Sequence, residues 1–228
     1  MKSLAVVLLL TLGTAAIAFA QGASSQKEEA KLELARTVNG QVLSSRTSPA
    51  VHITFDKAFK YAGGQTFILY DVALAEQHFF VDAAKDGKVK RLYWVQFEGY
   101  LPSNTHTYEY NSKTIAQLAG LDFFADAYPV KVNINEGRPN SDGQRAQLFL
   151  ESKGYRVQGA DVLMQRLVHL TDESKRNELM IIYVEDLGGS GLKAADLEPQ
   201  GRAAARWQEV QKGLLKRATE GLRIMHVR

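Results

Sequence analysis

Hydrophobic and polar residues alternate along most of the chain with a period of two, which predicts strands. From residue 180 to 184 the chain is continuously apolar, and this indicates a central strand that is buried on both faces. Gly63-Gly64, expected to form a hairpin turn, and other turn signals divide the pattern into about seven or eight strands. The clearest of them lie at residues 51–59, 65–83, 85–101, 105–112, 129–135, 162–170 and 177–187.

Asp86-Gly87 is typical of a two-residue turn between antiparallel strands. A loop made of these two residues sets the register of the hairpin and gives both of its faces bulky side chains. The opposed pairs are Phe79 with Trp94 and Gln77 with Gln96 on one face, and Phe80 with Tyr93, His78 with Val95 and Glu76 with Phe97 on the other. Because a sheet face open to water carries polar residues, we expect both faces of this hairpin to be covered.

Helical periodicity is clearest in residues 202–225, where apolar residues recur at intervals of three or four and basic residues largely take the other side. The apolar stripe consists of Ala203, Trp207, Val210, Leu214, Ala218 and Leu222. We therefore expect a long C-terminal helix that covers one face of the hairpin. Two minor helices are expected at residues 113–120 and 141–153, the second capped by Ser141 or Asp142.

These elements predict an α+β fold in which a curved antiparallel sheet packs on the long C-terminal helix. The order of elements is similar in outline to helix-grip lipid-binding proteins, and no motif assigns the chain to that family. Residues 49–228 are expected to form a single domain, with a division near Asn140 as the alternative. Residues 21–48 are polar and weakly patterned, which predicts a weakly structured leader.

The first twenty residues have the three parts of a secretory signal peptide. Lys2 precedes an apolar run at residues 4–12, and small residues follow up to Ala20. We expect cleavage after Ala20 and a secreted or periplasmic location, with an uncleaved signal anchor as the alternative. The chain has no cysteine, which excludes disulfides, thiolate zinc ligands and a catalytic thiolate.

One face of the predicted hairpin has the composition of a ligand pocket, mostly apolar with a few polar groups. Its candidate ligand-binding residues are Gln77, Phe79, Trp94, Gln96, Glu98 and Tyr100. They suit an apolar or amphipathic small molecule held against the sheet. The alternative is a solid core or a subunit contact with polar side chains that reach its rim.

Histidines and carboxylates provide only weak candidates for catalysis. None of the five histidines stands two, three or four residues from another, so no metal site is predicted and no cofactor is implied. His78 and Glu76 share the second face of the hairpin and could act as the base and its carboxylate partner in a hydrolase. The same two residues also fit a structural role.

Charge separates the end of the chain from the rest. From Gln200 onward there are seven basic and two acidic residues, whereas the preceding 199 residues carry a net charge of −2. The basic C-terminal helix could contact an anionic membrane surface weakly, or it could present an ordinary solvated face. The expected export and the net negative charge of residues 1–199 argue against nucleic acid as a partner.

Three functions follow from these patterns. A secreted or periplasmic binding module for an apolar or amphipathic small molecule is favoured, because of the composition of the hairpin. One alternative is a hydrolase that uses neither cysteine nor metal. The other is an envelope-associated structural or interaction protein that uses its basic C-terminal helix.

Overall fold

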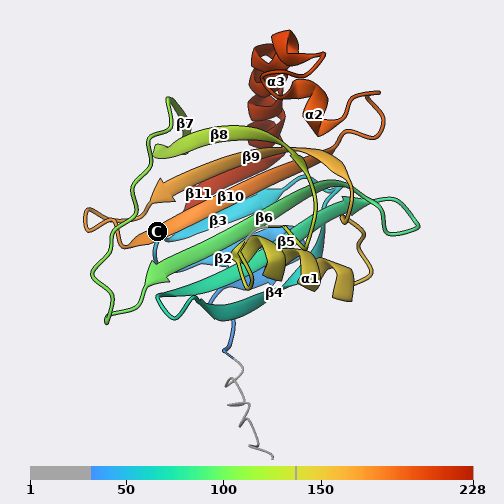
Figure 1. Cartoon of the computed structure of the whole chain (residues 1–228). Helices are drawn as coiled ribbons and strands as arrows, with labels where there is room; N and C mark the ends of the chain where they lie inside the picture. Colours follow the sequence, from blue (N-terminus) through green and yellow to red (C-terminus); the bar gives the residue numbers. More distant parts are fainter. Residues whose placement is uncertain (1–31, 137, 228) are drawn as a thin grey trace, which may run out of the picture. The chain divides into compact units, whose positions relative to one another are not determined.

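The strands of this protein form two antiparallel sheets, shown in Figure 1. The computed structural model describes residues 32–136 and 138–227, which belong to one compact unit. The predicted signal peptide and residues 21–31 of the predicted leader lie outside the described residues. In the described part of that leader, residues 37–39 and 42–45 form strands.

The larger sheet has seven strands in the order β4-β5-β6-β10-β9-β8-β7, and all neighbouring pairs are antiparallel. These strands are β4 (Lys60–Leu69), β5 (Ala73–Ala83), β6 (Val89–Tyr100), β7 (Thr114–Leu118), β8 (Leu121–Lys131), β9 (Asp161–Leu170) and β10 (Asn177–Asp186). β10 lies between β6 and β9, and its residues 178–184 are all buried. The predicted central strand is therefore confirmed.

The smaller sheet brings together strands from both ends of the described chain. Its order is β1-β2-β3-β11, and its strands are β1 (Thr37–Asn39), β2 (Val42–Ser45), β3 (Val51–Phe55) and β11 (Leu222–His226). Alternate residues of β3 are buried, namely Val51, Ile53 and Phe55. One face of this sheet thus packs on the core while the other is less buried, as the period of two requires.

The helices cover different faces of the seven-stranded sheet. The first, α1 (Asp142–Ser152), lies across one face, in front of β4 and β5 in Figure 1. Its N-cap is Ser141, whose Oγ accepts a hydrogen bond from the backbone N–H of Gln144 at 3.2 Å. The helices after β10 are α2 (Ala194–Leu197), the 3-10 helix η1 (Ala204–Arg206) and α3 (Trp207–Glu220). Of these, α3 packs on the opposite face from α1.

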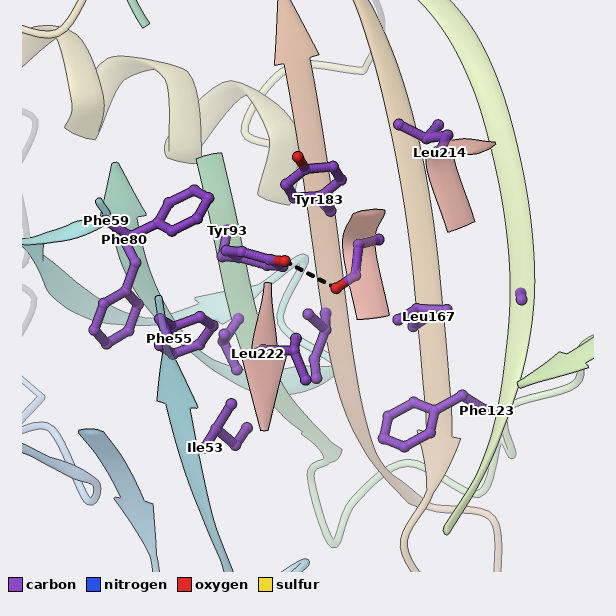
Figure 2. Packing of buried hydrophobic residues seen from close by; sticks show 14 of the residues in the cluster. Ile53, Phe55, Phe59, Phe80, Tyr93, Phe123, Leu167, Tyr183, Leu214 and Leu222 are labelled. Carbon is purple, nitrogen blue, oxygen red and sulfur yellow. Dashed lines mark hydrogen bonds between the residues drawn. The ribbon is translucent and has the colours of Figure 1, made fainter. Parts of the chain in front are cut away.

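We name the two faces of the seven-stranded sheet by what covers them. The inner face, which includes Tyr93, Val95, Phe97, Leu167 and Ile181, packs against the four-stranded sheet and α3 in the core that Figure 2 shows in part. The hydroxyl of Tyr93 donates to the carbonyl of Ala218 in α3 at 2.8 Å (Figure 2). The α1 face includes Phe79, Trp94, Val168 and Ile182, which pack with Ala146 and Leu150 of α1. The prediction that both faces of the β5–β6 hairpin are covered is therefore confirmed.

The β5–β6 hairpin has the predicted register along its length. Phe79 pairs with Trp94, and the other four predicted pairs also form. The register shifts near the tip, where the N–H of Ala84 donates to the carbonyl of Lys88 at 2.8 Å. The loop therefore has three residues instead of the predicted two. Its last residue, Gly87, has a φ of 84°, a left-handed conformation that glycine adopts at little cost.

The α+β class is confirmed, but the prediction of a single sheet is wrong. Within residues 32–136 and 138–227, eleven strands form two sheets. Five of these strands, β1, β2, β3, β7 and β11, have only three to five residues, and four of them, all except β3, lie where the sequence pattern predicted no strand. The helix-grip outline, in which one sheet grips one long helix, therefore does not describe this fold.

The long C-terminal helix expected at residues 202–225 is also wrong, because both of its ends have other structures. Residues 204–206 form η1, α3 spans Trp207–Glu220, and residues 222–226 form β11. The final segment pairs with β3, and this long-range partner, which the sequence pattern does not show, keeps Leu222 and Ile224 buried in a strand. Leu214 and Ala218 of the predicted stripe are buried as expected.

One of the two predicted minor helices is confirmed as α1, and the other is wrong. Residues 114–118 form β7, which pairs with β8 through Ala119 and Gly120. Both turn residues have positive φ values, 52° and 78°, as a two-residue hairpin turn requires. The turn predicted at Gly63-Gly64 is wrong as well, because both glycines lie inside β4, beside an irregularity in its pairing with β5.

Candidate ligand-binding site

A cavity of about 380 Å³ lies between α1 and the seven-stranded sheet. Pockets for small molecules have volumes of about 300–1,000 Å³ and mostly apolar walls. The sheet contributes Val89, Leu92, Trp94, Val130, Val162, Met164 and Val184. The α1 helix and its cap contribute Ser141, Gly143, Gln144, Ala146, Gln147 and Leu150. Further polar groups come from Lys131, Asn133, Glu136 and Asp186, so the lining is apolar with a few polar groups.

Three glutamines on neighbouring strands hold the first turn of α1. Gln65 on β4, Gln77 on β5 and Gln96 on β6 are neighbours in the sheet register. Gln65 Nε2 donates to Gln77 Oε1 at 2.7 Å, and Gln77 Nε2 donates to Gln96 Oε1 at 2.8 Å. The same two Nε2 groups also donate to the backbone carbonyls of Arg145 and Asp142, each at 3.1 Å. This glutamine chain therefore joins the sheet to the start of α1.

Three carboxyl groups, which we call the acid cluster, lie at the end of the glutamine chain. Glu98 on β6 and Glu178 on β10 are opposed in the sheet register, and Asp142 is the first residue of α1. Burial raises the pKa of all three groups. It raises the pKa of Glu178 to about 8, with a further contribution from the charges of Glu98 and Asp142. Each of these carboxyls therefore holds a proton more readily than an exposed one does.

Hydrogen-bond donors distinguish the members of the acid cluster. The hydroxyl of Tyr108 donates to Glu98 Oε1 at 2.8 Å, and Gln96 Nε2 donates to Glu98 Oε2 at 2.5 Å. Glu178 accepts one such bond, from the hydroxyl of Tyr110 to Oε2 at 2.5 Å. Because donors favour the ionised form, Glu98 is better placed to carry the charge and Glu178 to carry the proton.

Trp94 is the one predicted ligand-binding residue that lines this cavity in the described part of the chain. Its side chain is nearly buried, with the residue 6% exposed, and its Nε1 has no hydrogen-bond partner among the described residues. A buried donor without a partner costs about 1–3 kcal/mol. An acceptor brought next to this atom would remove that cost.

Of the other predicted ligand-binding residues, four hold the surroundings of the cavity in place and Tyr100 does not. Phe79 is completely buried and stacks on Phe149 of α1, with ring centroids 5.1 Å apart. Gln77 and Gln96 belong to the glutamine chain, and Glu98 belongs to the acid cluster. Tyr100 lines a separate cavity of about 300 Å³. The structure therefore brings most of these predicted residues to the α1 face, but they surround the cavity instead of lining it.

The predicted catalytic pair is in contact on the inner face. His78 Nε2 lies 2.7 Å from Glu76 Oε1, and His78 Nδ1 lies 3.0 Å from the hydroxyl oxygen of Tyr61. His78 is 0% exposed. Both ring nitrogens are therefore engaged by protein groups, and no edge of the ring is open to solvent.

Glu76 also binds the segment that precedes β1. Its carboxylate accepts hydrogen bonds from the backbone N–H groups of Ala35 and Arg36, each at 3.0 Å, and from the guanidinium of Arg36 at 3.1 Å. Burial alone would raise the pKa of Glu76, but the bonds from His78 and Ala35 and the charge of Arg36 outweigh it and lower the pKa to about 2. This arrangement fixes the chain entering the four-stranded sheet.

A wider groove of about 1190 Å³ adjoins the cavity and shares Ala160 and Asp186 with it. Several of its charged residues form ion pairs, such as Lys88 with Asp186 at 2.6 Å and Arg202 with Asp196 at 2.7 Å. Charges that are already paired and solvated contribute little to binding. The apolar cavity is therefore the stronger candidate site.

Sequence reasoning missed the part of the site that α1 supplies, and it missed Glu178 and Asp142. One signal for Glu178 is available, because it is a carboxylate next to the apolar run of a strand expected to be buried on both faces. No comparable signal exists for α1. Its apolar residues predict a packed helix without indicating which face of the sheet it covers.

Among residues 32–136 and 138–227, no group of three or more histidine or carboxylate side chains is arranged to hold a metal ion. The helices in that part of the chain are all too short or too polar to cross a membrane. No family model, curated protein or solved structure matches this chain. Its function therefore has to be inferred from the geometry of its own residues.

Proposed function

We propose that this protein is a secreted or periplasmic binding module that holds an apolar or amphipathic small molecule between α1 and the seven-stranded sheet. The observation that carries the proposal is the cavity of about 380 Å³ beside Trp94, whose walls are mostly apolar. The cavity is partly open to solvent, and its volume lies within the range of small-molecule sites, which supports a role in holding a guest. The secreted or periplasmic location is supported by the signal-peptide pattern of residues 1–20.

The polar groups in the cavity wall suit the head of an amphipathic molecule. Lys131 offers an ammonium group, and the side-chain amides of Asn133 and Gln144, which already donate to Glu136 and to the carbonyl of Ile134, each have a second N–H. An apolar tail that loses about 200 Å² of surface to water gains roughly 5 kcal/mol. Because association also costs translational and rotational freedom, we expect dissociation constants in the micromolar range or weaker.

Fluorescence of Trp94 provides a direct test. The chain has two tryptophans, so the variant Trp207→Phe leaves Trp94 as the only indole reporter. Titration with decanol and with decanoate is expected to give a saturable change in emission, because either molecule would lie against this side chain. Native mass spectrometry of the protein purified without detergent is expected to show a retained molecule.

A variant that fills the cavity supplies the control. Ala146→Leu places a larger side chain on the buried side of α1, and it is expected to abolish the emission change while the protein stays folded. The exposed Ala205→Leu, outside the cavity lining, should bind as the parent does. Equal binding by Ala146→Leu and the parent, or no saturable binding of either probe, contradicts the proposal.

A hydrolase is the second candidate, because the contact between His78 and Glu76 matches a general base with its carboxylate partner. It predicts that His78→Ala folds normally and loses hydrolytic activity. The complete burial of His78 favours a structural role, which predicts a loss of stability instead. Thermal unfolding and hydrolysis of a neutral ester, measured on the same variant, separate these outcomes.

The third function, contact of the basic C-terminal helix with an anionic membrane, has weaker support. Arg217 of α3 pairs with Glu185 at 2.8 Å, and Lys216 lies 3.7 Å from Glu220. These contacts neutralise part of the basic face. Co-sedimentation with vesicles of phosphatidylglycerol at low salt tests this function, since electrostatic attraction is strongest there.

A further inference from the structure

We propose that protonation of the acid cluster controls the docking of α1, so that α1 covers the cavity in acidic solution and releases it as Glu98, Glu178 and Asp142 ionise. This inference rests on the proposed function of the cavity and concerns its regulation.

The acid cluster lies where α1 meets the sheet. Glu98 and Glu178 belong to the sheet, whereas Asp142 belongs to α1, the element proposed to move. Ser141, Gly143 and Gln144, on either side of Asp142, line the cavity. A displacement of Asp142 therefore opens the cavity at the same end of α1.

The surroundings provide few charges that could balance three carboxylates. Titratable and charged groups from several elements pack around the cluster. They are Tyr100 on β6, Tyr108 and Tyr110 in the segment 101–113, Asp126 on β8, Arg145 on α1 and Arg166 on β9. Arg166 pairs with Asp126 at 2.8 Å, and its charge lowers the pKa of Glu178 and Asp142 without outweighing their burial. Arg145 lies over the ring of Phe67 at 4.6 Å. None of the ion pairs among the described residues includes a member of the acid cluster. Ionisation of all three carboxyls would therefore leave like charges facing each other across the α1 contact.

The glutamine chain connects the same carboxyls to the backbone of α1. Glu98 accepts the bond from Gln96, Gln96 accepts from Gln77, and Gln77 donates to the carbonyl of Asp142. A rearrangement at Glu98 thus disturbs the bonds that hold the first turn of the helix. Two kinds of contact, charge and hydrogen bonding, respond together to the loss of a proton.

The sign of the pH dependence follows from the raised pKa of Glu178. Its ordinary pKa is 4.5, and in the docked form it is about 8. The docked form therefore binds the proton more tightly than an open form with a solvated carboxyl. The free-energy advantage of the docked form over the open form is complete below about pH 4.5, and it is lost as the pH rises toward about 8.

Distance measurement between two spin labels tests the movement of α1 without any guest. The described chain has no cysteine, so labels can be placed at Leu148→Cys on the outer side of α1 and at Lys90→Cys on β6, both exposed positions. We expect one distance at pH 5.5 and a second, longer distance at pH 8.5, with the open fraction rising about tenfold or more. A distance distribution that is the same at both pH values overturns the inference.

Matched variants show whether the acid cluster is the cause. In the labelled protein, Glu178→Gln keeps the shape of the side chain without its charge, and it is expected to remain docked at pH 8.5. Glu173→Gln removes the same charge from an exposed loop and should leave the response unchanged. Asp142→Asn serves as a second variant should Glu178→Gln fail to fold. A pH response that persists in Glu178→Gln, or in Asp142→Asn in that case, overturns the inference.

Binding of decanol, which does not ionise, separates this inference from the proposed function. Its dissociation constant is expected to rise about tenfold between pH 5.5 and pH 8.5 in the parent protein and to stay constant in Glu178→Gln. If the labels show the movement of α1 but decanol fails to bind at pH 5.5, the proposed function fails and the pH-dependent docking stands. If decanol binds equally at both pH values and α1 does not move, the docking inference fails and the proposed function stands.

Discussion

Glu76 on the inner face and Glu178 on the α1 face are equally buried, each with 3% of the residue exposed, yet their pKa values move in opposite directions. The pKa of Glu76 falls to about 2, whereas that of Glu178 rises to about 8. Glu76 accepts three bonds from Ala35 and Arg36 and contacts His78, while Glu178 has one tyrosine donor and two carboxyl neighbours. Burial raises the pKa of both carboxyls; at Glu76 the bonds from His78 and Ala35 and the charge of Arg36 outweigh it, whereas at Glu178 the single tyrosine donor does not.

The two faces of the seven-stranded sheet also differ in how they are packed. The inner face joins the four-stranded sheet and α3 in a continuous core, and buried strand residues such as Leu167 have no exposed surface. On the α1 face the side chains border a cavity, and the covering helix is held by glutamines as well as by apolar contacts. The inner face is thus suited to stability, and the α1 face to accommodating a guest.

The largest effect is expected from shortening a leucine of the inner face. Leu167→Ala should lower the free energy of unfolding by about 3–4 kcal/mol, because it creates a new void in a packed core. Leu92→Ala, a leucine that is 4% exposed and already borders the cavity, should cost less, about 2 kcal/mol. Urea unfolding of both variants measures the difference. Equal losses would show that the two faces are packed alike.

Replacing a buried glutamate by glutamine should have opposite signs on the two faces. Glu76→Gln removes the negative charge that faces Arg36, with an expected loss of about 3 kcal/mol at pH 7. Glu178→Gln removes a charge that the α1 face does not favour, with an expected gain of about 1 kcal/mol at pH 8.5. Thermal and urea unfolding at these pH values provide the comparison. A loss of stability for both variants contradicts the contrast between the faces.

The same contrast predicts the pH at which the protein is most stable. The contribution of Glu76 is complete above about pH 4.5 and is lost as the pH falls toward 2, because its pKa is lowered. The contribution of Glu178 is complete below about pH 4.5 and is lost as the pH rises toward 8. We therefore expect maximum stability near pH 4.5 to 5. In Glu178→Gln the alkaline side of the profile should flatten, and a parent maximum above pH 7 would contradict this expectation.

Smaller effects than those of Leu167→Ala and Glu76→Gln are expected at one contact of the inner face, between Tyr93 and the end of α3. A methyl group added at Gly221 would lie 2.3 Å from the hydroxyl oxygen of Tyr93, so Gly221→Ala should cost about 2 kcal/mol. Tyr93→Phe removes the bond to the carbonyl of Ala218 and should cost about 1 kcal/mol. The double variant should lose less than the sum, since phenylalanine leaves room for the methyl group. Additive losses in a double-mutant cycle would show that the two sites do not interact.

Local patterns predicted the centre of the larger sheet well, because both signals there are strong. Asp86-Gly87 and the aromatic residues on both sides of it predicted a hairpin whose register is correct beyond its tip. The apolar run at residues 180–184 predicted the central strand β10. In these segments the turn and the pairing partner lie close together in sequence, so local information suffices.

Segments whose structure depends on distant partners were predicted poorly. Residues 222–226 continue a helical pattern, but they form a strand because β3 lies beside them. Residues 113–120 contain good helix formers, yet pairing with β8 overrides this preference. The candidate site shows the same division, since Trp94 was predicted on the correct face while the contribution of α1 was not. The face that a helix covers depends on tertiary packing and not on its own periodicity.

The pairing of β11 with β3 has a consequence for how the chain reaches its native state. Residues 51–55 acquire their second neighbour only when residues 222–226 are available, so the smaller sheet cannot be complete before residue 226 has been made. Until then β3 has an unpaired edge, and such edges readily join those of other molecules. A chain that ends at residue 221 is therefore expected to self-associate, and the late-synthesised strand acts as an intramolecular safeguard against aggregation.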